Sequence, residues 1–294
     1  MSAHPRLSIN QATIKYASFG DALALTAAAG VSSIGLWREP VAELGLAEAA
    51  RRLNGSGLRF SSLCRAGFFT MAEGQRRRDS IDDNRRAIVE TATMAAAGAD
   101  GSAAVLVLVA GGLPEGSTDL RGARERVRDA IGELAPDAAA AGVTLAIEPL
   151  HPMYASDRAV VSTLGQALDI AEQFADVTAS GAPAVGVVVD TFHVWWDPEL
   201  FPQIARAGAG SRIASYQVCD WATPLESDVL LSRHYPGDGV IDFAGITAAV
   251  EAAGYAGDVE VEIFNQRIWN GAWPTVIART AESFGSAVGQ HLAG

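Results

Sequence analysis

Eight short runs of apolar, often β-branched residues recur along the chain of 294 residues. Their starts are 25 to 45 residues apart, which leaves room in each interval for a strand, a crossover helix and loops. The runs begin at Leu7, Ser32, Leu58, Ala103, Val143, Val185, Ile213 and Asp258. Strands that alternate with helices predict a parallel α/β fold, and eight repeats favour a closed (β/α)8 TIM barrel over an open sheet. We expect a single domain over residues 1–294, because no Pro- or Ser-rich linker interrupts the pattern.

Alanine-rich segments between these runs end in residues that are typical of helix C-termini. Three predicted helices are each followed by a glycine suited to a left-handed C-cap. They are 21–29 with Gly30, 81–97 with Gly98, and 243–253 with Gly254. The basic cluster Arg76 to Asp79 is interpreted as a solvated turn before the second of these helices.

Composition excludes several classes of protein. Hydrophobic residues make up 49% of the chain and charged residues 19%, so a large core is expected rather than disorder. A net charge of −12 disfavours a nucleic-acid partner. The longest apolar stretch, 103–110, is far below the roughly 20 residues of a membrane span, and the N-terminus lacks the layout of a signal peptide. We therefore expect a cytoplasmic protein without membrane contact, in which Cys64 and Cys219 are reduced.

The later strands can be sorted by the alternation of inward and outward side chains in a barrel. Large residues suit the helix layer, and this places Ala214 and Tyr216 outward. The residues predicted to face inward are Thr144, Ala146, Glu148, Gly186, Val188, Asp190, Ile213, Ser215, Gln217, Asp258, Glu260 and Glu262. Four consecutive strands thus end inward with a polar side chain at the C-terminal mouth, where TIM-barrel active sites lie.

These four side chains, Glu148, Asp190, Gln217 and Glu262, predict a metal site. Three carboxylates brought together without a cation repel one another and are costly to desolvate. A hard divalent ion with oxygen ligands relieves both problems. The pattern therefore predicts one divalent metal ion at the mouth.

Other residues near these strand ends are candidates for catalysis or substrate contact. His151 and His193 each follow a predicted ligand, and Arg233, His234 and Asp238 lie in the seventh βα loop. Possible apolar walls for a sugar ring are Trp37, Phe68, Trp195, Trp196 and Trp221. Besides Arg233, only Arg65 and Arg267 offer cations at the mouth, so a neutral substrate is expected rather than a phosphorylated one.

The segments IEPLHP, VVVDTFHVWW, YQVCDW, PGDGVIDF and GDVEVEIFN together resemble the xylose-isomerase-like TIM-barrel superfamily of sugar isomerases and epimerases. The resemblance implies a divalent metal, with manganese preferred and magnesium or cobalt as alternatives, held by a Glu, an Asp, a His and a Glu. Glu148, Asp190 and Glu262 match three of these positions, whereas Gln217 stands where the family has the histidine. It also implies that His193 and Arg233 contact the substrate, and we assign Trp196 and Trp37 to the same role.

These residues predict a metal-dependent isomerase or epimerase of a small sugar. A metal bound to a ketone stabilises an enediolate, and Glu148 and Glu262 are placed to remove and return a proton, with His151 as a second candidate base. The resemblance also implies a homo-oligomer. One alternative is a lyase acting on 3-oxo-sugars, either a dehydratase or a C-glycoside deglycosidase catalytic subunit that needs a smaller partner chain. The other alternative is a non-catalytic sugar-binding barrel.

Overall fold

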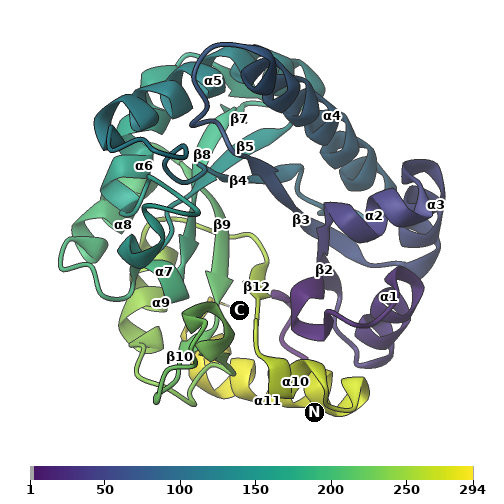
Figure 1. Cartoon of the computed structure of the whole chain (residues 1–294). Coiled ribbons are helices and arrows are strands. Elements are labelled where there is room, and N and C mark those ends of the chain that lie inside the picture. Colours follow the sequence, from purple (N-terminus) through teal and green to yellow (C-terminus); the bar gives the residue numbers. More distant parts are fainter. Residues whose placement is uncertain (1–2, 294) are drawn as a thin grey trace.

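The computed structural model describes residues 3–293 and confirms the predicted barrel. Eight parallel strands close into a ring in the order β1-β12-β9-β8-β5-β4-β3-β2 (Figure 1). The strands are β1 (Leu7–Asn10), β2 (Ser33–Trp37), β3 (Arg59–Gly67), β4 (Val105–Val109), β5 (Thr144–Glu148), β8 (Val185–Asp190), β9 (Ile213–Val218) and β12 (Val259–Val261). Each lies within or beside one of the eight apolar runs.

Most helices surround this ring on the outside, whereas two four-residue helices lie in the loops that follow β8 and β12 (Figure 1). They are α1 (Phe19–Ala28), α2 (Arg38–Leu44), α3 (Leu46–Ser56), α4 (Gln75–Ala97), α5 (Leu120–Ala141), α6 (Leu164–Ala171), α7 (Thr191–Val194), α8 (Leu200–Ala209), α9 (Phe243–Ala252), α10 (Gln266–Trp269) and α11 (Trp273–Ala287). Two small antiparallel ribbons lie outside the barrel sheet. One pairs β6 (Thr178–Ala179) with β7 (Ala182–Pro183), and the other pairs β10 (Asp220–Trp221) with β11 (Arg233–His234). Within the described residues, no helix is both long and apolar enough to span a membrane.

Short 3-10 helices occupy several loops. They are η1 (Gln11–Ile14), η2 (Pro152–Tyr154), η3 (Glu172–Phe174), η4 (Val229–Ser232) and η5 (Gly289–His291). The first apolar run therefore leaves the extended conformation after Asn10, whose side chain accepts a hydrogen bond from the backbone N–H of Ala12 at 3.0 Å. That side-chain cap ends the strand and starts η1.

Two of the three predicted glycine caps are confirmed. Gly30 and Gly254 have φ angles of +73° and +83°, in the left-handed region. Gly98 does not adopt this conformation, because its φ is −70° and its ψ 166°. A Cβ atom at Gly98 would collide with Ser102 Oγ, so this glycine is required by close packing rather than by a left-handed turn.

The interpretation of Arg76 to Asp79 as a turn is wrong. Helix α4 begins at Gln75, so the whole cluster is helical. Gln75 Nε2 donates to Asp79 Oδ1 at 2.6 Å, and Arg78 Nη2 donates to Gln75 Oε1 at 2.8 Å. These contacts between residues three and four apart stabilise an exposed first turn, which the charge pattern alone did not indicate.

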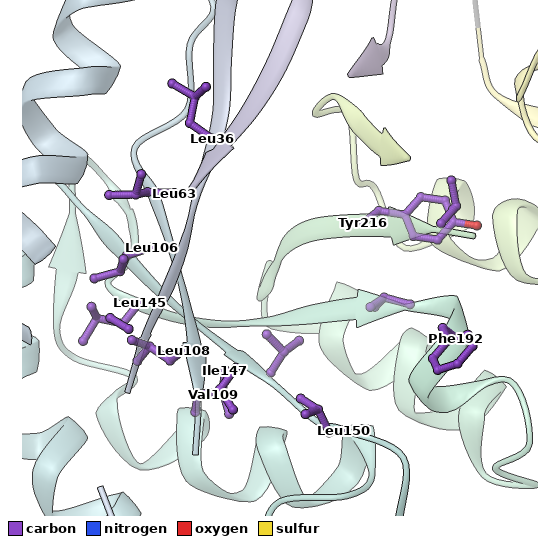
Figure 2. Packing of buried hydrophobic residues seen from close by; sticks show 14 of the residues in the cluster. Leu36, Leu63, Leu106, Leu108, Val109, Leu145, Ile147, Leu150, Phe192 and Tyr216 are labelled. Carbon is purple, nitrogen blue, oxygen red and sulfur yellow. The ribbon is translucent and has the colours of Figure 1, made fainter. Parts of the chain in front are cut away.

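The core has two parts, as the alternation of side chains predicts. A large cluster lies between strands and helices and includes Leu106, Leu145, Ile147 and Tyr216, all labelled in Figure 2. A small cluster fills the barrel interior and consists of Cys64, Val105, Val107, Ala146 and Val188. Both cysteines are buried and unbridged. The inner cluster forms an apolar floor, above which the polar strand ends lie.

Ala214 corrects the sorting of strand β9. It was predicted to face the helices, but it packs against the inner cluster. The register between β8 and β9 shifts here, since Val187 pairs with Ile213 whereas Val188 pairs with Ser215. An extra residue in one strand changes the direction of the local side chain, and a strict period of two cannot anticipate it.

Candidate active site

The four predicted ligands lie together at the C-terminal mouth of the barrel. Glu148 ends β5, Asp190 ends β8, Gln217 lies in β9, and Glu262 follows β12. All four are buried, with exposed fractions between 0% and 7%. Asp190 and Gln217 are register partners, so neighbouring strands bring their side chains to the same level.

Asp190 is fixed by the start of helix α7. Its Oδ1 accepts the backbone N–H of Phe192 at 2.8 Å, which caps this short helix. The other oxygen, Oδ2, is buried and lies 3.1 Å from Arg233 Nη1. Glu148, Asp190 and His193 each place a ligand atom within 4.8 Å of the other two, in an arrangement able to hold a metal ion.

Arg233 is the cation of the site. Its Nη1 lies 2.9 Å from Glu262 Oε2 and 3.1 Å from Asp190 Oδ2, and its Nη2 lies 2.9 Å from His193 Nε2. The guanidinium lies over the Phe192 ring at 4.7 Å and the Phe264 ring at 5.2 Å. The side chain is only 2% exposed, so these contacts leave the guanidinium in one place.

Burial sets the protonation of the site. Desolvation, followed by the charge of Asp190, raises the pKa of Glu148 well above its ordinary value. Desolvation raises the pKa of Glu262 to about 7, although the Arg233 charge opposes this shift. Desolvation and then Arg233 lower the pKa of His193 well below its ordinary range. His193 is therefore a neutral imidazole.

The residues present fit a hard divalent cation. When all three carboxylates are ionised, they and the Arg233 guanidinium carry a net charge of −2, which one divalent ion would neutralise. Within residues 3–293, the buried Gln217 Oε1 has no hydrogen-bond partner, and the buried Asp190 Oδ2 has only the Arg233 guanidinium close by, at 3.1 Å. A cation with oxygen ligands would satisfy this amide oxygen, which belongs to the register partner of Asp190 on the neighbouring strand.

Gln217 is oriented from below by a buried network. Its Nε2 lies 3.3 Å from Glu260 Oε2 and 3.9 Å from Cys64 Sγ, which leaves its carbonyl oxygen free of protein donors. Asn10 Nδ2 also donates to Glu260 Oε2, at 2.9 Å. Glu260 is 1% exposed, and it fits because Gly35 on β2 has no side chain in its place.

We expect Gly35→Ala to destabilise the protein by about 1–3 kcal/mol, as typical of overpacking in a core. A Cβ atom at this position would collide with the Glu260 carboxylate, which is buried and cannot move into solvent. Urea denaturation of the purified variant measures the change. Gly55→Ala is the matched control, since a Cβ there meets nothing within 4 Å and helix α3 favours alanine. An unchanged midpoint for Gly35→Ala would contradict this packing.

Aromatic residues form one wall of the mouth around His151. The His151 ring lies 5.1 Å from that of Trp221 and 5.5 Å from that of Trp196, and its Nδ1 accepts the backbone N–H of Met153. Trp196 Nε1 donates to the carbonyl oxygen of His193 at 2.8 Å. His151 is therefore half-buried beside the carboxylates, with one nitrogen already used in a local turn.

The other predicted residues divide into two groups. Trp37 lies at the opposite wall, 5.6 Å from Phe264. His234 pairs with Asp238, which also binds Arg279 on the protein surface, and Arg267 pairs with Glu226 while 87% exposed. His234 and Arg267 thus pair with Asp238 and Glu226, respectively, rather than with the carboxylates of the site.

Some residues of the site were not selected from the sequence. Asn10 ends strand β1, so the inward alternation that found the other four strand ends could have found it as well. Glu260 was assigned inward but given no role. Phe264, which packs on Arg233, follows the last strand in a loop, where no periodicity indicates a direction.

Comparison with known proteins places this chain in a family. The model of the xylose isomerase-like TIM barrel family matches residues 23–285. The crystal structure of protein SMc04130 from Sinorhizobium meliloti 1021 has 47% sequence identity and a TM-score of 0.88, and the alignment covers 96% of this chain and 98% of that one. The crystal structure of an IOLI protein with a bound zinc atom has 20% identity and a TM-score of 0.81, over 98% and 100% of the two chains. Solved sugar 3-epimerases share the fold too.

A curated relative resembles part of the chain. The 3-dehydroshikimate dehydratase of Pseudomonas aeruginosa is 33% identical over 156 residues, which is 51% of this chain and 22% of the relative. A protein of the same name from Pseudomonas putida is matched over 13% of its length, so the chain spans only a small part of both relatives. The family and its solved members thus include sugar-processing enzymes and a dehydratase. On the match of the family model and the sequence identity to SMc04130, this chain belongs to the xylose isomerase-like TIM barrel family.

Proposed function

We propose that this protein is a divalent-metal-dependent dehydratase, a lyase that removes a proton next to a ketone and then expels a neighbouring hydroxyl group as water. The unequal pairing of the two glutamates carries this proposal. Glu262 is bound by Arg233 at 2.9 Å, whereas no ion pair joins Glu148 to a cation within residues 3–293. The partial likeness to 3-dehydroshikimate dehydratases supports the same reaction class.

A single free carboxylate suffices for dehydration. Glu148 takes the proton from the carbon next to the ketone and returns it to the departing hydroxyl group, so a C–H and a C–O bond break, a C=C bond forms, and water leaves. Inversion at one carbon requires proton donors and acceptors on both faces instead. The pairing of Glu262 with Arg233 therefore favours elimination over epimerisation.

Four residues would hold the metal, namely Glu148, Asp190, Gln217 and Glu262, whereas the nearby His193 ring is already engaged by Arg233. When bound, a divalent ion withdraws electron density from the ketone oxygen and stabilises the enolate. Each donor is an oxygen atom, and such a set suits manganese or magnesium better than zinc. Glu148 has two oxygens, so that ligation through one leaves the other for the proton.

Neighbouring groups keep these roles in place. Neutral His193 accepts a hydrogen bond from Arg233, which is in turn held by two carboxylates and two aromatic rings. The aromatic wall of Trp196 and Trp221 excludes water from one side of the mouth and offers a flat surface to a ring-shaped substrate.

A sugar epimerase or isomerase is the second candidate. Burial raises the pKa of Glu262 to about 7, and a carboxylate with that pKa can return a proton at neutral pH from the face opposite Glu148. The shared fold with solved sugar 3-epimerases is compatible with this reaction.

Proton NMR in D2O distinguishes the two. We expect the manganese- or magnesium-loaded protein to convert 3-dehydroshikimate to a product with aromatic proton signals, because loss of water from that ring ketone followed by enolisation makes the ring aromatic. Ketoses incubated in parallel are expected to remain unchanged. Deuterium uptake by a ketose with a change of configuration, without any aromatic product, would replace the dehydratase by the epimerase. Unchanged spectra for all substrates would contradict both.

A further inference from the structure

A large cavity lies on the Trp37 side of the barrel mouth. Its volume is about 880 Å³, and Trp37, Arg65 and Phe264 contribute to its lining. Phe264 contacts Trp37 on one side, with ring centroids 5.6 Å apart, and Arg233 on the other, at 5.2 Å. Phe264 thus lines the cavity and also contacts Arg233 of the site, so a substrate whose ketone lies at the carboxylates can reach the cavity past this ring.

Arg65 is an unpaired cation in this lining. Two other arginines of the cavity have carboxylate partners, Arg52 with Glu48 at 2.8 Å and Arg158 with Asp228 at 3.8 Å. Among the described residues, no carboxylate lies within 4.0 Å of Arg65 or of Lys15, the remaining cation of the lining. Lys15 lies over the Trp269 ring at 4.5 Å.

Two aromatic rings hold Arg65 without neutralising it. Its guanidinium lies 5.5 Å from the centroid of Trp37 and 5.4 Å from that of Phe68. Trp37 is itself fixed, because its Nε1 donates to Asn10 Oδ1 at 2.8 Å. Rings beside a guanidinium favour its charge and leave its N–H edge free for an anion.

Phe68 reaches this position at a conformational cost. Its φ is +62°, in the left-handed region that non-glycine residues rarely adopt, and its side chain is 45% exposed. Its backbone N–H donates to the Val109 carbonyl at 2.8 Å, which ties the strained residue to strand β4. An exposed aromatic residue kept in a strained conformation beside an unpaired cation indicates a ligand contact rather than core packing.

We propose that Arg65 binds a carboxylate group of the substrate, so that the enzyme selects acidic ring ketones over neutral keto sugars. This inference rests on the proposed function and names its substrate class. A guanidinium binds a carboxylate through two parallel N–H···O hydrogen bonds. Three acidic residues, Glu39, Glu43 and Asp228, also line the cavity, and their charge favours a monoanion over a doubly charged phosphate. This proposal differs from the expectation of a neutral substrate drawn from the sequence.

Isothermal titration calorimetry with two small ligands tests the proposal. The ligands are 3,4-dihydroxybenzoate, the ring acid that dehydration of 3-dehydroshikimate would release, and catechol, the same ring without the carboxylate. We expect Arg65→Gln to weaken binding of the acid by about 10- to 100-fold and to leave catechol binding unchanged. Lys15→Gln is the matched control, since it removes the other unpaired cation of the cavity.

Each outcome has one meaning. Equal affinity of the acid for the wild type and Arg65→Gln overturns the inference, as does a loss seen with Lys15→Gln instead. Thermal melting shows whether Arg65→Gln is folded, and Arg65→Lys, which keeps the charge, is expected to recover part of the affinity. Arg65-dependent binding of the acid without turnover of 3-dehydroshikimate would keep the inference and reject the dehydratase. Full turnover of 3-dehydroshikimate with unchanged KM in Arg65→Gln would keep the dehydratase and reject the inference.

Discussion

Arg233→Met is expected to lower the free energy of unfolding of the metal-free protein by about 3–5 kcal/mol at pH 7.5, as is typical when one partner of a buried ion pair is removed. The guanidinium lies within 3.1 Å of both Asp190 and Glu262, and all three side chains are at most 5% exposed. Without it, these two carboxylates are buried with no compensating charge. Guanidinium chloride denaturation in the presence of a chelator measures the change.

The difference in unfolding free energy between the wild type and Arg233→Met is expected to become smaller as the pH falls from 7.5 to 5.5. Burial already raises the pKa values of Asp190 and Glu262 in the folded wild type, and Arg233 opposes this. Loss of the cation raises them further, so the folded variant takes up protons at higher pH than the folded wild type and gains stability relative to it as the pH falls. Arg279→Met is the control, because Arg279 is 45% exposed and its ion pairs lie on the surface. A deficit below about 1 kcal/mol at pH 7.5 would contradict the buried pairing.

Glu148→Gln is expected to reduce kcat for dehydration by about 10²- to 10⁴-fold, which is the usual contribution of a positioned general base. Glutamine has the same shape and keeps an oxygen donor, as Gln217 does, but its amide does not accept the proton. Steady-state assays that follow the aromatic product in the ultraviolet measure the loss. Metal content is determined in parallel, so that loss of the ion is not mistaken for loss of the base.

Glu115→Gln is the comparison for this substitution. Glu115 is exposed and lies in the loop after β4, outside the carboxylate cluster. The activity of Glu115→Gln is therefore expected to equal that of the wild type. If Glu148→Gln with bound metal kept more than about a tenth of the wild-type kcat, the role of Glu148 as the base would be wrong.

The barrel and the polar strand ends could be predicted because both depend on local periodicity. Side chains alternate along each strand, and parallel strands all end at the same side of a barrel. The eight repeats therefore predict that Glu148, Asp190 and Gln217 lie at one end of the barrel. The shift at Ala214 shows the limit of this reasoning. An irregular pairing depends on how two strands meet, and neither strand's sequence records it.

The electrostatics of the site could not be predicted in the same way. Arg233 follows strand β9 by a loop that contains η4, and it reaches the carboxylates through the β10–β11 ribbon. Nothing in the periodicity of a loop indicates where such a side chain will be buried. The left-handed conformation of Phe68 is equally hidden, because phenylalanine gives no sequence signal for a positive φ.

The content of divalent metal per chain tests the central feature of the site most directly. The wild type is dialysed against a chelator, then against manganese, and finally against metal-free buffer, and the retained metal is measured by mass spectrometry beside Glu148→Ala treated in the same way. A site with three carboxylates, one guanidinium and an unsatisfied amide oxygen predicts close to one ion per wild-type chain and a large loss in the variant. Absence of retained metal in the folded wild type, or equal retention by both proteins, would contradict it.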